Sequence, residues 1–301
     1  MRIIYAIFLC GLYSGTTAAQ DFCQPVEEYD KLTSTVTEQF YDRTFNGLDW
    51  DERVSLYRTR VSCTDDEVAV AAVINELLLE LDASHTTVYT PADLDYWGIN
   101  SLFHPSLDSY VINFPGIWPE RIAGKWYARF VFEDSPAKRA GIQPGDDLLA
   151  LNGQPFAPLG FPEGESILTI SPDGHTRKDI PIVALRQSVM RAVVNAALAS
   201  AEIVERGGKK IGRFQLWTAR DSILEGFNST LDEFEKLNID ALVIDLRGPY
   251  GGTGEQYLGR IRESQYLQKI PKFFLIDDSS RSGKEWLSGI IRKDGLGTLI
   301  G

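Results

Sequence analysis

Apolar residues follow two alternating patterns in the second half of the chain. Short runs of apolar and β-branched residues predict strands, and between them lie longer stretches with apolar residues at helical spacing. Strands that alternate with helices in this way predict crossover units and a largely parallel sheet. We expect Gly207 and Gly208 to end the first of these helices. The predicted strands are 211–218, 241–247 and 272–276, and the predicted helices are 188–206, 222–237, 254–263 and 283–293.

Residues 25–95 are predicted to be mostly helical. Thr64 and Glu67 fit a capping box, and behind them apolar residues recur three and four positions apart. This helix is predicted to end near residues 82–85, and the β-branched and aromatic residues of Thr86–Tyr89 then predict a strand. The apolar face of the helix consists of Val70, Val73, Ile74, Leu77, Leu78 and Leu81.

Residues 96–187 contain short apolar runs separated by proline and glycine, and they predict a small β domain with one or two short helices. Strands are predicted at Ala128–Phe132 and Leu148–Leu151, and Asn152-Gly153 predicts a tight hairpin turn after the second. Ser135-Pro136 predicts the start of a helix with proline in its first turn.

The first nineteen residues predict a signal peptide. A basic start at Arg2, an apolar run over residues 3–12 and the small residues Thr17-Ala18-Ala19 fit export and cleavage. The apolar run is too short to span a bilayer, so no stable membrane anchor is predicted, and an uncleaved anchor is the alternative. The protein is therefore expected to be exported, either to the periplasm or outside the cell.

Composition narrows the classes of partner. Hydrophobic residues make up 44% and charged residues 24% of the chain, as in ordinary globular proteins. With 42 acidic and 30 basic residues the net charge is −12, which argues against nucleic acid as a partner because phosphate binding needs a basic face. In an exported protein Cys23 and Cys63 can form a disulfide or remain as two thiols, and both alternatives are open.

A serine lies where a predicted strand turns into a predicted helix. Strand 272–276 is followed by small polar residues and by Ser282, after which the helix begins. At such a junction the hydroxyl projects from the carboxyl edge of the sheet, and the helix N-terminus favours developing negative charge. The N–H of Gly283 can donate to the same oxyanion. Ser282 is therefore either a nucleophile or an ordinary helix N-cap.

A glycine pair follows the strand 241–247. Gly251 and Gly252 have no Cβ, so their N–H groups can approach a substrate oxygen closely. The alternative is an ordinary loop between a strand and a helix. No Gly-Lys-Ser or Gly-Lys-Thr follows, and this excludes a phosphate-binding P-loop.

The chain has three histidines, and one of them is a candidate for catalysis. His104 and His175 are predicted to lie on the surface, whereas His85, at the end of an apolar helix, is either a structural histidine or a general base. The sequence has neither a His-Glu-x-x-His motif nor Cys/His spacing of metal ligands, so no metal or organic cofactor is expected.

The order of these features resembles the tail-specific, or C-terminal processing, serine proteases and their relative, the tricorn protease core. A helical segment ending in His-Thr, a PDZ-like segment, a linker helix, and a β/α segment with Asp-Leu-Arg, Gly-Gly and then Ser occur in the family's order. The most specific match is Phe132–Gly153, which resembles a PDZ core. Ser-Arg-Ser-Gly-Lys-Glu at 280–285 resembles the family's Ser-Ala-Ser-Ala-x-Glu. The resemblance runs from about residue 30 to the last residue.

This resemblance implies a multidomain α/β fold. The implied parts are a signal peptide (1–19), a helical N-terminal domain (25–95), a PDZ-like β domain (96–187) and a β/α crossover domain like those of crotonases and Clp proteases (188–301). The last domain is predicted to be incomplete, because the chain stops in the apolar, strand-like run Gly297–Ile300.

The resemblance also implies a catalytic role for Ser282, which would attack the scissile carbonyl and form an acyl-enzyme. The N–H of Gly283, together with that of Gly251 or Gly252, would hold the oxyanion.

Two bases are compatible with the resemblance. In the processing proteases the base is a lysine about two dozen positions after the nucleophile, a position that lies beyond Gly301 here. Tricorn-type enzymes use a histidine preceded by serine, as His85 is. Two other lysines do not fit the family's pattern. Lys284 is predicted to face solvent, and Lys293 is predicted to close a helix, where a cation suits the dipole.

The implied function is that of an exported serine endopeptidase that hydrolyses peptide bonds near protein C-termini. Its partners would be polypeptides with accessible C-termini, recruited by the PDZ-like domain through a carboxylate-binding loop. The alternative is a catalytically inactive homologue that binds peptides or other ligands, and the substitutions around Ser282 favour it. By the family pattern the loop contains Phe114, Gly116 and Ile117, with Trp118 in place of the second glycine.

Overall fold

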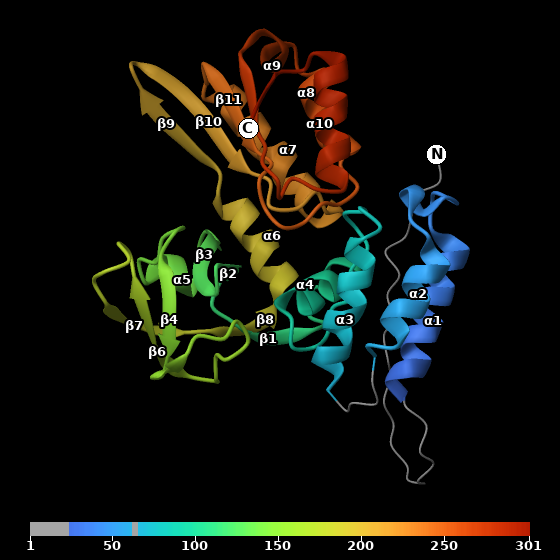
Figure 1. Cartoon of the computed structure of the whole chain (residues 1–301). Coiled ribbons are helices and arrows are strands. Elements are labelled where there is room, and N and C mark those ends of the chain that lie inside the picture. Colours follow the sequence, from blue (N-terminus) through green and yellow to red (C-terminus); the bar gives the residue numbers. More distant parts are fainter. Residues whose placement is uncertain (1–23, 62–65) are drawn as a thin grey trace. The chain divides into compact units, whose positions relative to one another are not determined.

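The computed structural model describes residues 24–61 and 66–301 (Figure 1). The chain divides into two compact units, one that ends at Tyr96 and one that spans Trp97–Gly301. The predicted signal peptide, Cys23 and Cys63 lie outside the described residues. Within the described ranges, no helix is long and apolar enough to cross a membrane.

Helices build the first unit, as the sequence predicts. Tyr29 of the first helix and Leu77 of the third are completely buried in its core. The Tyr29 hydroxyl also donates a hydrogen bond of 2.7 Å to the carbonyl of Val54, which ties the first helix to the second. The helices are α1 (Gln24–Gln39), η1 (Phe45–Gly47), α2 (Trp50–Arg58) and α3 (Glu67–Leu79), and α4 (Leu94–Phe103) spans the boundary between the units.

The structure differs from two local predictions in this unit. Helix α3 is capped by Asp66, whose carboxylate accepts two backbone N–H groups of the first turn, and the predicted cap residue Thr64 lies outside the described residues. Residues 86–89 form no strand. Their backbone is bound by a side chain instead, because the Asn75 amide group pairs with the N–H and carbonyl of Val88 at 2.8 and 2.9 Å.

The first part of the second unit is antiparallel β structure, as predicted. Its strands follow the order β2-β3-β4-β6-β7, with β5 beside β4. Asn152 and Gly153 form the turn between β4 and β5, and their φ angles of 51° and 76° are those of a tight hairpin turn. Ser135 caps the short helix α5 (Pro136–Arg139), also as predicted. The strands are β2 (Ile117–Ile122), β3 (Lys125–Val131), β4 (Asp147–Leu151), β5 (Gln154–Pro155), β6 (Glu165–Ser171) and β7 (Lys178–Val183), and β1 (Val111–Phe114) pairs separately with β8 (Leu185–Ser188).

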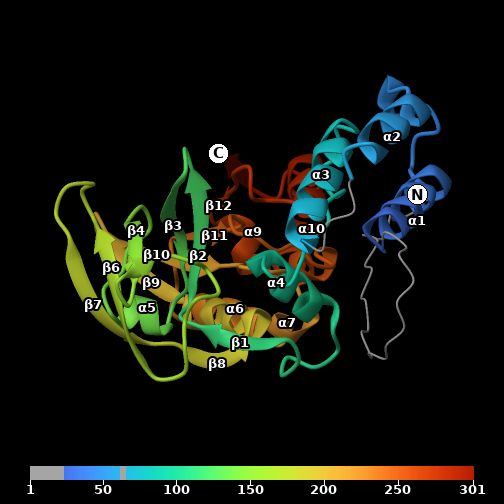
Figure 2. The same ribbon diagram turned by 60° about the horizontal axis from the view of Figure 1, so that its bottom comes forward.

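The second part of this unit is α/β structure with a mostly parallel sheet (Figure 2). The strand order is β13-β12-β11-β10-β9, in which only β9 runs antiparallel to its neighbour. The strands predicted from residue 209 onward are all present, and the predicted helix 254–263 is a 3-10 turn followed by a short α-helix. The strands are β9 (Glu202–Arg206), β10 (Lys209–Gln215), β11 (Ala241–Asp245), β12 (Lys272–Leu275) and β13 (Thr298–Ile300), and the helices are α7 (Asp221–Lys236), η2 (Glu255–Leu258), α8 (Gly259–Glu263), α9 (Gln265–Lys269) and α10 (Gly283–Asp294).

The predicted helix 188–206 is shorter than expected. Helix α6 covers only Val189–Ala199, and the last five residues of the predicted range form β9 (Glu202–Arg206). Gly207 and Gly208 do not end a helix but form the two-residue turn between β9 and β10. Both have positive φ, which this turn requires and glycine adopts without strain.

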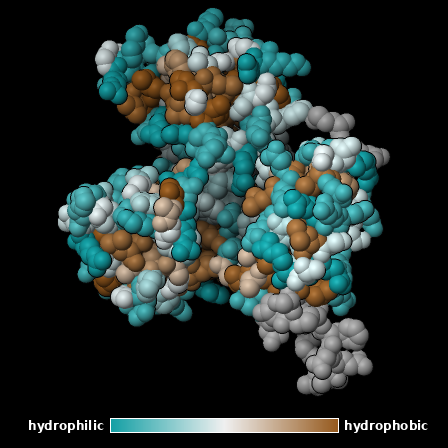
Figure 3. Space-filling view, in the orientation of Figure 1, coloured by the Kyte–Doolittle hydropathy of each residue, from teal (hydrophilic) through white to brown (hydrophobic). Residues whose placement is uncertain are grey.

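Helix α7 covers one face of the parallel sheet. Phe227 of α7 and Phe214 of β10 are both buried, and their rings meet edge to face with centroids 5.1 Å apart. On the opposite face Val243 and Phe273 are half-buried. Figure 3 shows apolar side chains gathered over this sheet.

The strand register places three loops together at one end of the sheet. Gln215 at the end of β10 lies beside Asp245 at the end of β11, and Asp245 lies beside Leu275 at the end of β12. Because these strands are parallel, the loops that follow them meet at the carboxyl edge, where ligands bind in open α/β sheets.

Candidate active site

Ser282 lies in a sharp turn between β12 and α10. Its φ of 59° and ψ of −125° are unfavourable for a residue with a Cβ, so the surrounding structure must hold it there. The turn before it is fixed by Asp277, whose carboxylate accepts a hydrogen bond of 2.9 Å from the N–H of Ser279. Such strained strand-to-helix turns present a nucleophilic serine at the carboxyl edge of a sheet.

The position of Ser282 is also that of the N-cap of α10. The Glu285 carboxylate accepts a hydrogen bond of 2.6 Å from the N–H of Ser282. A glutamate at this spacing often reaches back in this way to the start of its helix. Ser282 therefore occupies the N-cap position, as one of the two interpretations predicts, and its role as a nucleophile stays a prediction.

Gly251 lies directly against Ser282. A Cβ at position 251 would lie 2.7 Å from the Cβ of Ser282 and 2.9 Å from the backbone nitrogen of Gly283, so only glycine fits. Among the described residues, the N–H groups of Gly251 and Gly283 donate to no acceptor. Two unpaired N–H donors thus lie beside the serine, as the sequence prediction of an oxyanion site requires.

Gly252 and Gly283 complete a packed glycine cluster. A Cβ on Gly252 would collide with the backbone of Ala219, and a Cβ on Gly283 would collide with the carbonyl of Gly252. The carbonyl of Gly251 accepts hydrogen bonds from the N–H of Ala219 at 2.7 Å and from the Thr218 hydroxyl at 2.8 Å. The loop after β10 therefore holds the glycine loop in place.

The loop after β11 is bound to the turn before α10. The N–H of Gly248 donates to the Ser279 hydroxyl at 2.8 Å, and the Ser280 hydroxyl donates to the carbonyl of Leu246 at 3.1 Å. Asp245 is buried and accepts two hydrogen bonds from the Arg247 guanidinium, at 2.8 and 2.6 Å. These bonds fix the two loops that carry Gly251 and Ser282.

Lys284 is completely buried, and the prediction that it faces solvent is wrong. Its Nζ donates to the carbonyl oxygens of Trp217 at 3.0 Å and Gly248 at 3.4 Å. Burial lowers the pKa of Lys284 to about 7, although two nearby aspartates act in the opposite direction. The sequence does carry a signal for this burial, since Lys284 lies three and seven positions before the buried Leu287 and Ile291 on one helix face.

His85 belongs to the first unit, where it is exposed. Its Nδ1 lies 2.8 Å from the Ser84 hydroxyl, and the other predicted site residues all belong to the second unit. Its role as a general base stays a prediction.

The predicted carboxylate loop packs into the β domain. Phe114 and Ile117 are buried, with 1% and 2% of their surface exposed. Gly116 has a φ of 87°, and its carbonyl accepts a hydrogen bond of 2.9 Å from the N–H of Phe132. The three residues thus lie together, and their binding role stays a prediction.

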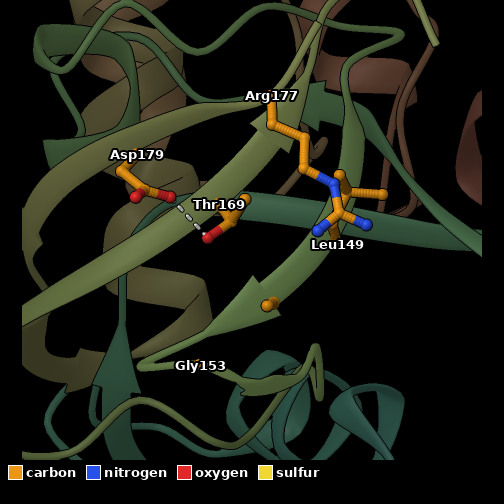
Figure 4. Close-up of a pocket in the computed structure, with 6 residues that line it drawn as sticks. Leu149, Gly153, Thr169, Arg177 and Asp179 are labelled. Carbon is orange, nitrogen blue, oxygen red and sulfur yellow. Dashed lines mark hydrogen bonds between the residues drawn. The ribbon is translucent and has the colours of Figure 1, made fainter. Parts of the chain in front are cut away.

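A separate hollow of about 370 Å³ lies on the β domain and contains none of the predicted site residues. Figure 4 shows Arg177 and Asp179 beside it, with the Thr169 hydroxyl donating to Asp179 at 2.7 Å. The lining residues are Leu149, Ala150, Gly153, Thr169, Arg177 and Asp179.

The chain is similar to proteases that process carboxyl termini. It is 28% identical over 204 residues to the carboxy-terminal processing protease CtpB of Bacillus subtilis, and the match covers 64% of this chain and 40% of CtpB. It is 22% identical over 308 residues to the carboxyl-terminal-processing protease of Picosynechococcus, with 88% of this chain and 69% of that protein covered. No protein-family model matches the chain.

A solved structure has a similar fold. The photosystem II D1 C-terminal processing protease aligns with a TM-score of 0.55 and 14% identity, over 91% of this chain and 80% of its own. The predicted resemblance to the C-terminal processing proteases is therefore confirmed, and the fold is shared with one of them. The chain spans less than half the length of CtpB.

Proposed function

We propose that this chain is an exported serine endopeptidase that cleaves polypeptides near their C-termini, with Ser282 as its nucleophile. The observation that carries the proposal is the packing of Gly251 against Ser282, with the N–H groups of Gly251 and Gly283 both without an acceptor among the described residues. The printed names of the relatives, which are carboxyl-terminal processing proteases, support the substrate class.

In this proposal the Ser282 hydroxyl attacks the scissile carbonyl. The carbonyl oxygen becomes negative, and the N–H groups of Gly251 and Gly283 donate to it. The C–N bond then breaks, the amine leaves with a proton, and an ester forms on Ser282. Water hydrolyses this ester and releases the shortened polypeptide. A general base takes the proton of the Ser282 hydroxyl as the new bond forms.

We further propose that the small β domain is PDZ-like and recruits the substrate's tail. Strand β2 pairs only with β3 and lies at an edge of its sheet, so an extended peptide can add alongside it. The neighbouring loop of Phe114, Gly116 and Ile117 would bind the terminal carboxylate. The lack of a side-chain cation in this loop favours binding through backbone N–H groups.

A second function, that of an inactive homologue that binds peptides, is favoured by one observation. His85 is exposed and its ring contacts the neighbouring Ser84, which is an arrangement that needs no catalytic role.

Acylation by a fluorophosphonate probe separates the two functions. We expect the full-length protein to be labelled on Ser282, as mapped by mass spectrometry, and the Ser282→Ala variant not to be labelled. Ser222→Ala is the matched control, because Ser222 is an exposed serine at a helix start in the same unit, and it should label as the wild type does. Equal labelling of Ser282→Ala and wild type would refute the assignment, and absence of labelling in both would favour the binding function.

A further inference from the structure

The first turn of α10 contains a buried amine that the proposed mechanism does not use. Lys284 is completely buried and lies on the same helix face as Leu287 and Ile291, which are also buried. Placing a lysine there is costly unless its amine is hydrogen bonded or neutral. The residue therefore needs a structural or functional reason.

The amine of Lys284 joins two loops that are distant in sequence. Its Nζ donates to the carbonyl of Trp217, in the loop after β10, and to the carbonyl of Gly248, in the loop after β11. Among the described residues these two carbonyls accept no other hydrogen bond. Since buried backbone carbonyls need a donor, both loops depend on this one side chain.

The same two loops position the groups around Ser282. The loop after β10 contains Thr218 and Ala219, which donate to the carbonyl of Gly251. The loop after β11 carries Gly251 itself, which packs against Ser282. Lys284 is two positions after Ser282, so one side chain connects both loops to the helix that begins at the nucleophile.

Acidic groups from two other elements face the amine. Asp245 at the end of β11 is buried and already paired with Arg247, and Asp277 lies in the loop after β12. Both raise the pKa of Lys284, whereas burial lowers it to about 7. The charge of the amine therefore changes near neutral pH.

We propose that Lys284 is a positioning residue that holds the Gly251 loop at the distance from Ser282 that an oxyanion needs. The proposal rests on the proposed function for its catalytic consequence. Its structural part, the tethering of the loops after β10 and β11, is independent of catalysis.

The test compares Lys284→Met with wild type and with Lys293→Met, a matched control that removes an exposed lysine from the same helix. Hydrogen exchange is measured for the peptides that contain 216–219 and 246–252, and fluorophosphonate acylation is measured from pH 6 to pH 9. In Lys284→Met we expect about tenfold faster exchange in both loops and about tenfold slower acylation. We expect an inflection near pH 7 in the acylation rate of the wild type, and none in that of Lys284→Met. Lys293→Met should match wild type in both measurements.

The outcomes separate this proposal from the proposed function. Faster exchange in both loops of Lys284→Met supports the tether even if the wild type is never acylated, in which case only the nucleophile assignment fails. Unchanged exchange with normal acylation overturns the positioning role and leaves the nucleophile intact. If Lys284→Met does not fold, Lys284→Gln retains an N–H donor without the charge and is compared in the same way. If the two loops of Lys284→Gln exchange at the wild-type rate, an N–H donor at position 284 is enough to tether them. If the two loops of a folded Lys284→Met exchange at the wild-type rate, the tether is refuted.

Discussion

A Cβ atom on Gly251 would lie 2.7 Å from the Cβ of Ser282. This distance is far below ordinary van der Waals contact, so the main chain at 251 packs against the side chain at 282 with no room for a larger residue. The glycine loop and the turn that carries the serine are thus one packed structure, built from the loops after β11 and β12.

Replacing Gly251 by alanine should therefore separate the proposed oxyanion donors from the serine. We expect the rate of fluorophosphonate acylation of Gly251→Ala to fall by about a hundredfold or more, the usual cost of losing one oxyanion donor. Gly259→Ala is the control, because a Cβ at 259 meets nothing within 4 Å. Equal acylation rates in the two variants would contradict this geometry.

Lys284 should make stability depend on pH above neutrality. Its folded pKa is about 7 and its ordinary value is 10.5, so between these values the unfolded chain binds more protons than the folded one. The free energy of unfolding must then rise with pH in this window, by roughly 3 kcal/mol from pH 7 to pH 10.

Denaturant unfolding at pH 7 and pH 10 measures this rise. Lys284→Met has no group at position 284 that titrates in this range. The free energy of unfolding of the wild type should therefore increase relative to that of the variant as the pH rises. If the difference between their free energies of unfolding stays constant from pH 7 to pH 10, the pKa of Lys284 is not lowered in the folded protein.

Much of the second unit follows from local sequence patterns. The amphipathic helix α7 and the strand β11 lie within a few residues of their predicted positions, because each has a long run of one periodicity. The Asn152-Gly153 turn was predictable because these residues tolerate positive φ. The resemblance placed Gly251 or Gly252 beside Ser282, and Gly251 does lie there because the parallel strands β11 and β12 bring the loops after them to one edge.

The remaining features depend on contacts between distant residues. β9 was predicted as the end of a helix, and only its pairing with β10 makes it a strand. Residues 86–89 have strand propensity, but the Asn75 side chain takes the hydrogen bonds that a neighbouring strand would make. Helical spacing places Lys284 on the buried face of α10, but only the fold shows that the carbonyls of Trp217 and Gly248 accept its hydrogen bonds there.

Asp66 should stabilise the first unit as the N-cap of α3. Its carboxylate accepts the N–H groups of Val68 and Ala69 at 3.0 and 3.1 Å. Asp66→Ala leaves both without this acceptor, and we expect the free energy of unfolding to fall by about 1 kcal/mol. Serine can also cap a helix, so the free energy of unfolding of Asp66→Ser, measured by chemical denaturation, should be close to that of the wild type. A loss in Asp66→Ser as large as that in Asp66→Ala would argue against capping.

Trp217 provides the last prediction, because it links the β domain to the loops around Ser282. Its indole N–H donates to the Glu133 carboxylate at 2.9 Å, and its ring meets that of Phe132 edge to face. Trp217→Phe keeps an aromatic ring and removes the donor, so the partly buried Glu133 loses a hydrogen bond to a charged group. We expect the free energy of unfolding to fall by about 1.5–3 kcal/mol.

Trp286→Phe is the matched control, since Trp286 is 45% exposed on α10. The free energy of unfolding of this variant should stay within about 0.5 kcal/mol of the wild-type value. If the hydrogen bond carries the effect, the double variant Trp217→Phe/Glu133→Gln should be no less stable than Trp217→Phe alone, because the acceptor's charge is then no longer left without its donor. Additive losses in the double variant would assign the effect to the volume of the indole ring and not to its bond with Glu133.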